Sequence, residues 1–94
     1  MLVLPAELTQ NETPAALRML VQGLRAQSGS AVVADASGLV RFDSSALALL
    51  LECRRECLAM GKSFSVRGLP TRLRSLAGLY GVAGMLPVVA GEAA

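Results

Sequence analysis

The sequence predicts an α/β fold of one domain, in which helices cover a small sheet. A chain of 94 residues has the usual length of one compact domain. The apolar run 31–36, with Val32 and Val33 at its centre, is typical of a buried strand, and residues 64–67 supply another. Because a long helical stretch separates these strands, they form a βαβ unit, whose crossover is parallel and right-handed in nearly all proteins.

Local signals define the elements before the first buried strand. Residues 1–4 are apolar and end at Pro5, which favours a short edge strand. Thr13 and Pro14 are typical of a helix start, and the pattern after them predicts an amphipathic helix that ends near residues 27–29. Its apolar face repeats at helical spacing, through Leu17, Leu20, Val21 and Leu24.

The long helix opens at Asp43-Ser44-Ser45, reaches Met60 and ends before Gly61. After the strand at 64–67, a further helix starts at residues 68–71. Its apolar residues share one face, and they are Leu69, Leu73, Leu76, Ala77 and Tyr80.

The C-terminal segment has two apolar pairs around Pro87, at 85–86 and 88–89, which favours a last edge segment. We expect one domain over residues 1–90 and a frayed tail over 91–94.

Composition and charge argue against several classes of protein. Apolar residues make up 53% of the chain and the mean hydropathy is +0.53. The longest apolar run, Ala46 to Leu51, is nevertheless far shorter than the ~20 residues of a membrane-spanning helix, so we expect no direct insertion into a membrane. The apolar excess favours a protein partner. A net charge of +2 gives no support for nucleic-acid binding, and the N-terminus lacks the pattern of a signal peptide, so we expect a cytoplasmic protein.

Cofactor and metal binding are not indicated. Cys53 and Cys57 lie four residues apart on one helix, where side chains seldom reach disulfide geometry. We interpret them as reduced, half-buried packing residues, with a thiol sensor or metal ligand as the alternative. The chain has no histidine and no second cysteine pair, so we expect no zinc site and no cofactor.

Enzymatic activity is not indicated either. A nucleophilic serine needs a base within hydrogen-bond reach, and no histidine is present to supply one. Asp35 and Asp43 are eight residues apart, and nothing in the sequence fixes them as a catalytic pair. The glycines lack the spacing of a phosphate-binding loop.

The segment Asp43-Ser44-Ser45 has two interpretations. Residues 37–43 are expected to form a loop at the carboxyl ends of the strands, where open α/β sheets place functional residues. Asp and Ser are favoured helix caps, so the segment can simply begin the helix. Alternatively, a hydroxyl at a helix N-terminus is a favourable place for a phosphate, since the free amides and the helix dipole stabilise negative charge.

The six apolar residues after this segment cannot all face inward at 3.6 residues per turn. With Leu47, Leu50, Leu51 and Leu58 toward the sheet, Ala48 and Leu49 are expected to face outward beside Glu52. The helix is then either extensively covered or carries an apolar contact patch ringed by charge, which is the interpretation we favour.

Three arginines, Arg67, Arg72 and Arg74, cluster around the last helix. They predict a solvated face, with an acidic partner surface or a phosphate-bearing ligand as the alternative.

Two strings of the sequence resemble a known family. Residues 32–47, from Val-Val-Ala-Asp through Phe-Asp-Ser-Ser-Ala-Leu, resemble the core of STAS domains. Gly68-Leu69-Pro70 and the later Leu-Ala-Gly-Leu-Tyr-Gly-Val string resemble the MlaB branch, the small STAS subunit of Mla phospholipid-transport ABC complexes. The likeness covers residues 2–87 and includes 7–9, which are similar to an early turn of the family. It implies a mixed sheet with helices packed mainly on one face, and no enzymatic activity.

The resemblance also implies a partner. In Mla-like complexes the STAS subunit docks on the ATPase subunit at the cytoplasmic face of the inner membrane, through the region around a motif hydroxyl that Ser44 matches. The expected partner-binding residues are Phe42, Asp43, Ser44, Ser45, Ala48, Leu49 and Glu52.

A second branch of the family implies signalling instead. In anti-sigma factor antagonists a partner kinase phosphorylates the hydroxyl that Ser44 matches. The sequence leaves this alternative open, and it also leaves open whether the chain forms a homodimer.

Overall fold

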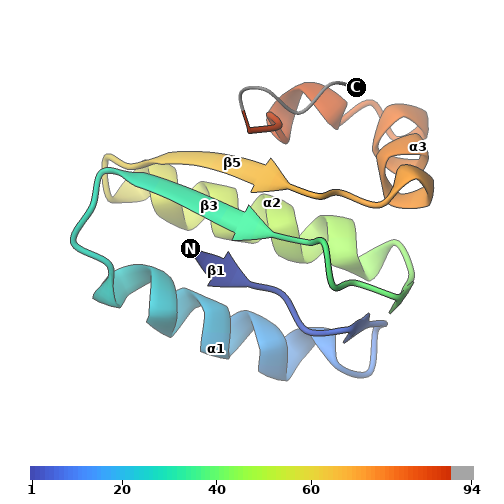
Figure 1. The fold of residues 1–94 in the computed structure, drawn as a ribbon, viewed down its shortest axis with the longest axis horizontal. Helices are drawn as coiled ribbons and strands as arrows, with labels where there is room; N and C mark the ends of the chain where they lie inside the picture. The colour runs from blue at the N-terminus through green and yellow to red at the C-terminus, as the bar shows by residue number, and fades with distance from the viewer. Residues whose placement is uncertain (90–94) are drawn as a thin grey trace.

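The computed structural model describes residues 1–89, and a three-stranded parallel sheet forms its centre (Figure 1). The strand order is β1-β3-β5, with β1 at Leu2–Val3, β3 at Ala31–Asp35 and β5 at Ser63–Arg67. A bridge between Val66 and Val88 places the expected last edge segment beside β5. The expected tail, residues 91–94, lies outside the described residues.

Helices cover mainly one face of this sheet. They are α1 (Thr13–Ala26), α2 (Ser45–Ala59), α3 (Thr71–Leu79) and the short 3₁₀ helix η1 (Ala83–Met85). In Figure 1, α2 lies behind β3 and β5, α1 runs beside it below β1, and α3 and η1 lie beyond β5. The predicted α/β fold, with its βαβ unit β3-α2-β5, is confirmed. None of the described helices combines the length and apolar character that a membrane crossing requires.

Alternating burial along the strands explains why one face is covered. Val32 and Ala34 of β3, and Phe64 and Val66 of β5, are buried, whereas the residues between them are half-buried. This period of two is that of a strand with one face on the core. The buried sides of α1 and α2 complete an aliphatic core against these side chains.

The long helix ends as the sequence predicted. Gly61 has a φ of +70°, a left-handed conformation that glycine adopts without steric cost. The Gly61 N–H donates to the Leu58 carbonyl at 3.1 Å, and the Lys62 N–H donates to the Cys57 carbonyl at 2.8 Å. These two bonds satisfy carbonyl groups that the helix end leaves unpaired.

Two short strands were not predicted, and one of them lies within the predicted loop 37–43. Glu7–Leu8 (β2) and Arg41–Phe42 (β4) pair in parallel, with Leu8 opposite Phe42. We interpreted residues 37–43 as a loop, because a strand of two residues is too short to show alternation. The pairing fixes the backbone position of Phe42 and therefore that of Asp43, the next residue.

Both cysteines lie deeper than the half-buried position we predicted. Cys53 and Cys57 are free and buried among core side chains. Burial raises the pKa of the Cys53 thiol to about 12, and burial also raises the pKa of Cys57. Neutral thiols in the core fit the packing interpretation.

Candidate functional site

The segment from Phe42 to Ser45 joins β4 to α2 at the carboxyl end of the sheet, at the right of Figure 1. In parallel α/β sheets this end is the usual place for functional residues. Three segments that are distant in sequence meet here: the start of α1, the start of α2 and the start of α3.

Asp43 begins α2 through its carboxylate. Its Oδ1 atom accepts hydrogen bonds from the Ser45 N–H, at 2.9 Å, and from the Ser45 hydroxyl. Its Oδ2 atom accepts the Gln10 N–H at 3.1 Å, which ties the loop before α1 to the start of α2. The bonds from Ser45 hold the pKa of Asp43 below its ordinary value, so the carboxylate is ionised at neutral pH.

Ser45 serves the fold in a second way. Its Oγ atom lies 3.0 Å from the Thr13 Oγ1 atom at the first residue of α1. The Thr13 Oγ1 atom also lies 2.8 Å from the Thr9 carbonyl oxygen, so its one proton has two possible acceptors. Ser45 is thus a linking residue between the two helix starts, and its hydroxyl is already engaged.

Ser44 differs from both of its neighbours. It is exposed, and it occupies the N-cap position of α2 without a side-chain capping hydrogen bond. Its backbone carbonyl accepts the Leu47 N–H at 3.1 Å and the Ala48 N–H at 3.4 Å. Because Asp43 supplies the cap, the Ser44 hydroxyl is available at the surface for another molecule.

Phe42 connects this segment to α3. Its ring is half-buried against the core, and the Arg72 guanidinium carbon lies 5.5 Å from the ring centroid, a cation–π distance. Val40, two residues earlier, leaves 76% of its surface exposed. An aromatic edge and an exposed valine therefore lie close in the chain to the Ser44 hydroxyl.

The outer face of α2 differs from our expectation. Ala48 is exposed and Glu52 is half-exposed, as predicted, but Leu49 is only 1% exposed, so its placement on the outer face was wrong. Leu58, which we placed toward the sheet, is 52% exposed, and Leu51 is half-buried. The reason is that α2 packs against α1 as well as against the sheet. The buried side of α2 is therefore wider than a sheet alone would cover, and it includes Leu49.

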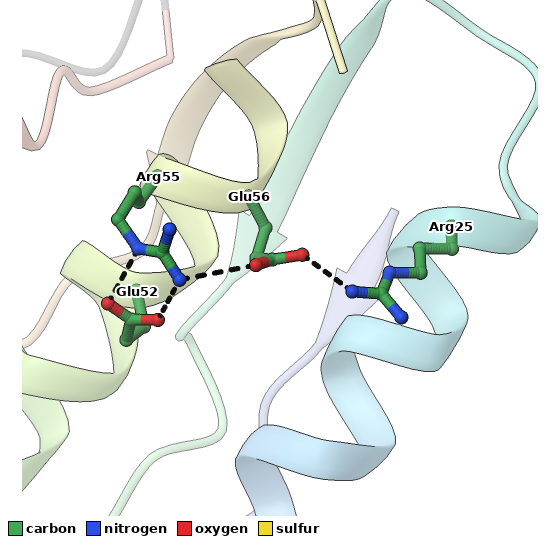
Figure 2. Close-up of polar contacts among 4 residues, drawn as sticks. All are labelled: Arg25, Glu52, Arg55 and Glu56. Atoms are coloured by element: carbon green, nitrogen blue, oxygen red, sulfur yellow. Dashed lines mark hydrogen bonds and ion pairs between the residues drawn. The ribbon is translucent and has the colours of Figure 1, made fainter. Parts of the chain in front are cut away.

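Glu52 belongs to a chain of ion pairs that runs along α2 and across to α1 (Figure 2). Its carboxylate accepts two bonds from Arg55, at 2.9 and 2.8 Å, which lower the pKa of Glu52. Arg55 also lies 3.3 Å from Glu56, which pairs with Arg25 of α1 at 3.0 Å. Of these charged residues, Glu52 lies one helical turn after Ala48, and the others lie further along α2 or on α1.

Asp35, the other carboxylate considered from the sequence, is held in the same way as Asp43. Asp35 accepts the Ser37 hydroxyl and N–H, and these bonds lower the pKa of Asp35 as those of Ser45 do for Asp43. Both carboxylates are therefore ionised at neutral pH, and each is bonded to its own serine. Among residues 1–89, no three His, Cys, Asp or Glu side chains gather in a way that could hold a metal ion.

A family model described as "Mlab, STAS domain" matches residues 1–88. The chain belongs to the STAS domain family. STAS domains are generally non-catalytic binding domains, and the family model carries the name of the branch that the sequence resembles. No curated protein matches the chain.

In this STAS domain, three residues that contribute to the site escaped sequence analysis. Gln10 and Thr13 bond to Asp43 and Ser45, and Arg72 lies over Phe42. Thr13 was recognised only as a helix start, and Arg72 only as part of a basic face. The sequence has no signal for these contacts, because each one joins segments about thirty residues apart.

Proposed function

We propose that this STAS domain is a non-catalytic subunit that binds the ATPase subunit of an Mla-type phospholipid-transport ABC complex. It would act at the cytoplasmic face of the inner membrane, held there by the complex. The family match supports the MlaB-like role. We name the surface formed by Phe42, Asp43, Ser44, Ala48 and Glu52 the Ser44 surface.

The observation that carries this proposal is the contrast between Ser44 and Ser45. Ser45 and Asp43 already satisfy the helix start, so Ser44 is not needed there. A partner group that accepts or donates a hydrogen bond at Ser44 gains a contact without breaking one inside the domain. Around the hydroxyl, the small exposed Ala48 and the edge of Phe42 allow close approach of another chain.

The local bonding gives little support to a phosphate at Ser44. The Ser45 N–H already donates to the Asp43 carboxylate, and the Ala46 N–H donates to the Asp43 carbonyl at 3.1 Å. A phosphate would therefore find these amides occupied and an ionised carboxylate beside it. The signalling role of an anti-sigma factor antagonist is for this reason not the one we propose.

Substitution at Ser44 tests the proposal directly. Ser44→Arg places a charge and a bulky side chain in the proposed contact, and we expect it to weaken binding of the purified Mla-type ATPase subunit from the same organism by about tenfold or more. Ser28→Arg is the matched control, because Ser28 is exposed and lies before β3, at the opposite end of the sheet. Circular dichroism checks that both variants fold.

Equal affinity of wild type and Ser44→Arg for the ATPase would overturn the proposed surface. Absence of any binding by the wild-type domain would overturn the proposed partner. Mass spectrometry of the domain from cells adds a further test, because a substantial phosphorylated fraction at Ser44 would favour the signalling role instead.

A further inference from the structure

A cavity of about 220 Å³ lies between α3, η1 and the segment that follows η1. It lies outside the Ser44 surface. Among the described residues, its lining is apolar apart from one side chain, that of Arg74 on α3. The apolar walls include Leu69, Ala77, Ala83, Leu86 and Val88.

Backbone hydrogen bonds fix the walls of this cavity. Gly81, with a φ of +73°, reverses the chain after α3, and the Val82 N–H donates to the Ala77 carbonyl at 2.9 Å. On the other side, Val66 of β5 donates to the Pro87 carbonyl at 2.8 Å and accepts the Val89 N–H at 3.0 Å. A cavity held in this way needs little reorganisation to receive a ligand.

Arg74 is the polar group of the cavity, and within residues 1–89 its guanidinium forms no ion pair. Among residues 1–89, Nε is a buried side-chain atom without a hydrogen-bond partner. Nε itself has almost no accessible surface and lies out of a ligand's reach, so it is the unneutralised positive charge of the guanidinium that favours an anion in the cavity. The six carboxylates of the described residues bond elsewhere, to Arg41, Thr9, Ser37, Ser45, Arg55 and Arg25.

We propose that this cavity binds a single-chain amphiphile with a carboxylate head group. The apolar walls take the alkyl chain, and the carboxylate accepts hydrogen bonds from Arg74, whose planar guanidinium matches a carboxylate edge. The volume is below the ~300–1,000 Å³ of sites for drug-sized ligands, which favours one short chain over a two-chain lipid. This inference does not depend on the proposed function of the Ser44 surface.

Binding of octanoate tests this proposal, and acetate and 1-octanol are the control ligands. In proton–nitrogen correlation spectra of the full chain, octanoate below its micelle concentration should shift the Arg74 Nε–H signal and the amides of Ala83 and Leu86. Acetate has the charge without the chain, and octanol has the chain without the charge. We expect each to bind at least about tenfold more weakly than octanoate.

Two variants and one control locate the site. Arg74→Gln should weaken octanoate binding by about tenfold, because the charge-assisted bonds are lost. Ala83→Leu should also weaken it, since the larger side chain occupies the cavity from an exposed position on η1. Arg18→Gln should bind octanoate as the wild type does, because Arg18 is exposed on α1 and does not line the cavity.

Several results would overturn the proposal. Octanoate binding no tighter than octanol binding would remove the role of Arg74, and unchanged binding by Arg74→Gln or Ala83→Leu would place the ligand elsewhere. Binding to vesicles of anionic phospholipid is the last measurement. Arg74-dependent binding to vesicles, without binding of monomeric octanoate, would assign the site to a membrane surface rather than to a free single-chain ligand.

Discussion

The Ser45 Oγ atom lies 3.0 Å from the Thr13 Oγ1 atom, so two hydroxyl groups join the first turns of α2 and α1. Each hydroxyl has one proton and accepts further bonds. The Ser45 hydroxyl donates to Asp43, which leaves Thr13 to donate either to Ser45 or to the Thr9 carbonyl. Ser44, the residue before Ser45, takes no part in this group. Adjacent serines thus have different roles, one within the fold and one at the surface.

Removal of the Ser45 hydroxyl should destabilise the domain, whereas removal of the Ser44 hydroxyl should not. Ser45→Ala breaks a bond to a helix-capping carboxylate and should lower the free energy of unfolding by about 1 kcal/mol. Ser44→Ala breaks no capping bond and should change it by less than about 0.5 kcal/mol. Urea denaturation followed by circular dichroism measures both.

The Ser45 hydroxyl both contacts Thr13 and bonds to Asp43. Thr13→Val removes only the first of these two interactions. If the two hydroxyls interact, the double variant Ser45→Ala, Thr13→Val should lose less stability than the sum of the single variants. If the losses of stability in the two single variants add up to the loss in the double variant, the 3.0 Å contact between the hydroxyls does not stabilise the fold.

Asp43 should make the stability depend on pH in the acidic range. Its pKa in the folded protein is lowered by the bonds from Ser45. A lowered folded pKa contributes stability that is present above the unfolded pKa and is lost as the pH falls through the folded pKa. Asp43→Asn has no such titration, so its melting temperature should fall less than that of the wild type between about pH 5 and about pH 2. An equal fall in both proteins would show that the carboxylate is not stabilised in the fold.

The fold was largely predictable from the sequence, because each main element has a local signal. The apolar run at β3, the cap residues before α2 and Gly61 after it all act within a few residues. The ladder of β2 and β4 was missed because two residues show no period and the pairing joins segments far apart in sequence.

The residues that begin α2 were predictable from the sequence, but the residues on the outer face of α2 were not. Asp43 and Ser44 were identified from the pattern, yet nothing in the run Ala46 to Leu51 indicates which leucines meet α1. Packing against a second helix decides that, and it is a tertiary property. Leu49 was misplaced for this reason.

The corrected orientation of α2 gives a direct prediction for two leucines. Leu49→Ala opens a cavity in the core and should lower the free energy of unfolding by about 2–5 kcal/mol. Leu58→Ala, on the same helix, removes a side chain that is half in solvent and should cost about 1 kcal/mol or less. Chemical denaturation of the two variants compares them. A larger loss for Leu58→Ala would reverse the orientation of the helix.

The two cysteines should resist alkylation while the domain is folded. The pKa of Cys53 is raised to about 12 by burial, and only a thiolate reacts readily. Iodoacetamide at about pH 8 should therefore label neither thiol in the native domain and both in urea, as mass spectrometry can count. Rapid labelling of the native domain would show that this part of α2 opens frequently.

The ion pair between Arg25 and Glu56 should contribute little to stability, although it links α1 to the charged chain on α2 (Figure 2). The Arg25 side chain is 63% exposed, so solvent screens the attraction. Arg25→Met should lower the free energy of unfolding by about 0.5 kcal/mol, and about 1 M salt should remove the difference from the wild type. Arg18→Met on the same helix is the control, because Arg18 is likewise exposed and forms no ion pair within residues 1–89. A cost above about 2 kcal/mol that persists in salt would mean that the pair orients α1 on α2 rather than decorating the surface between them.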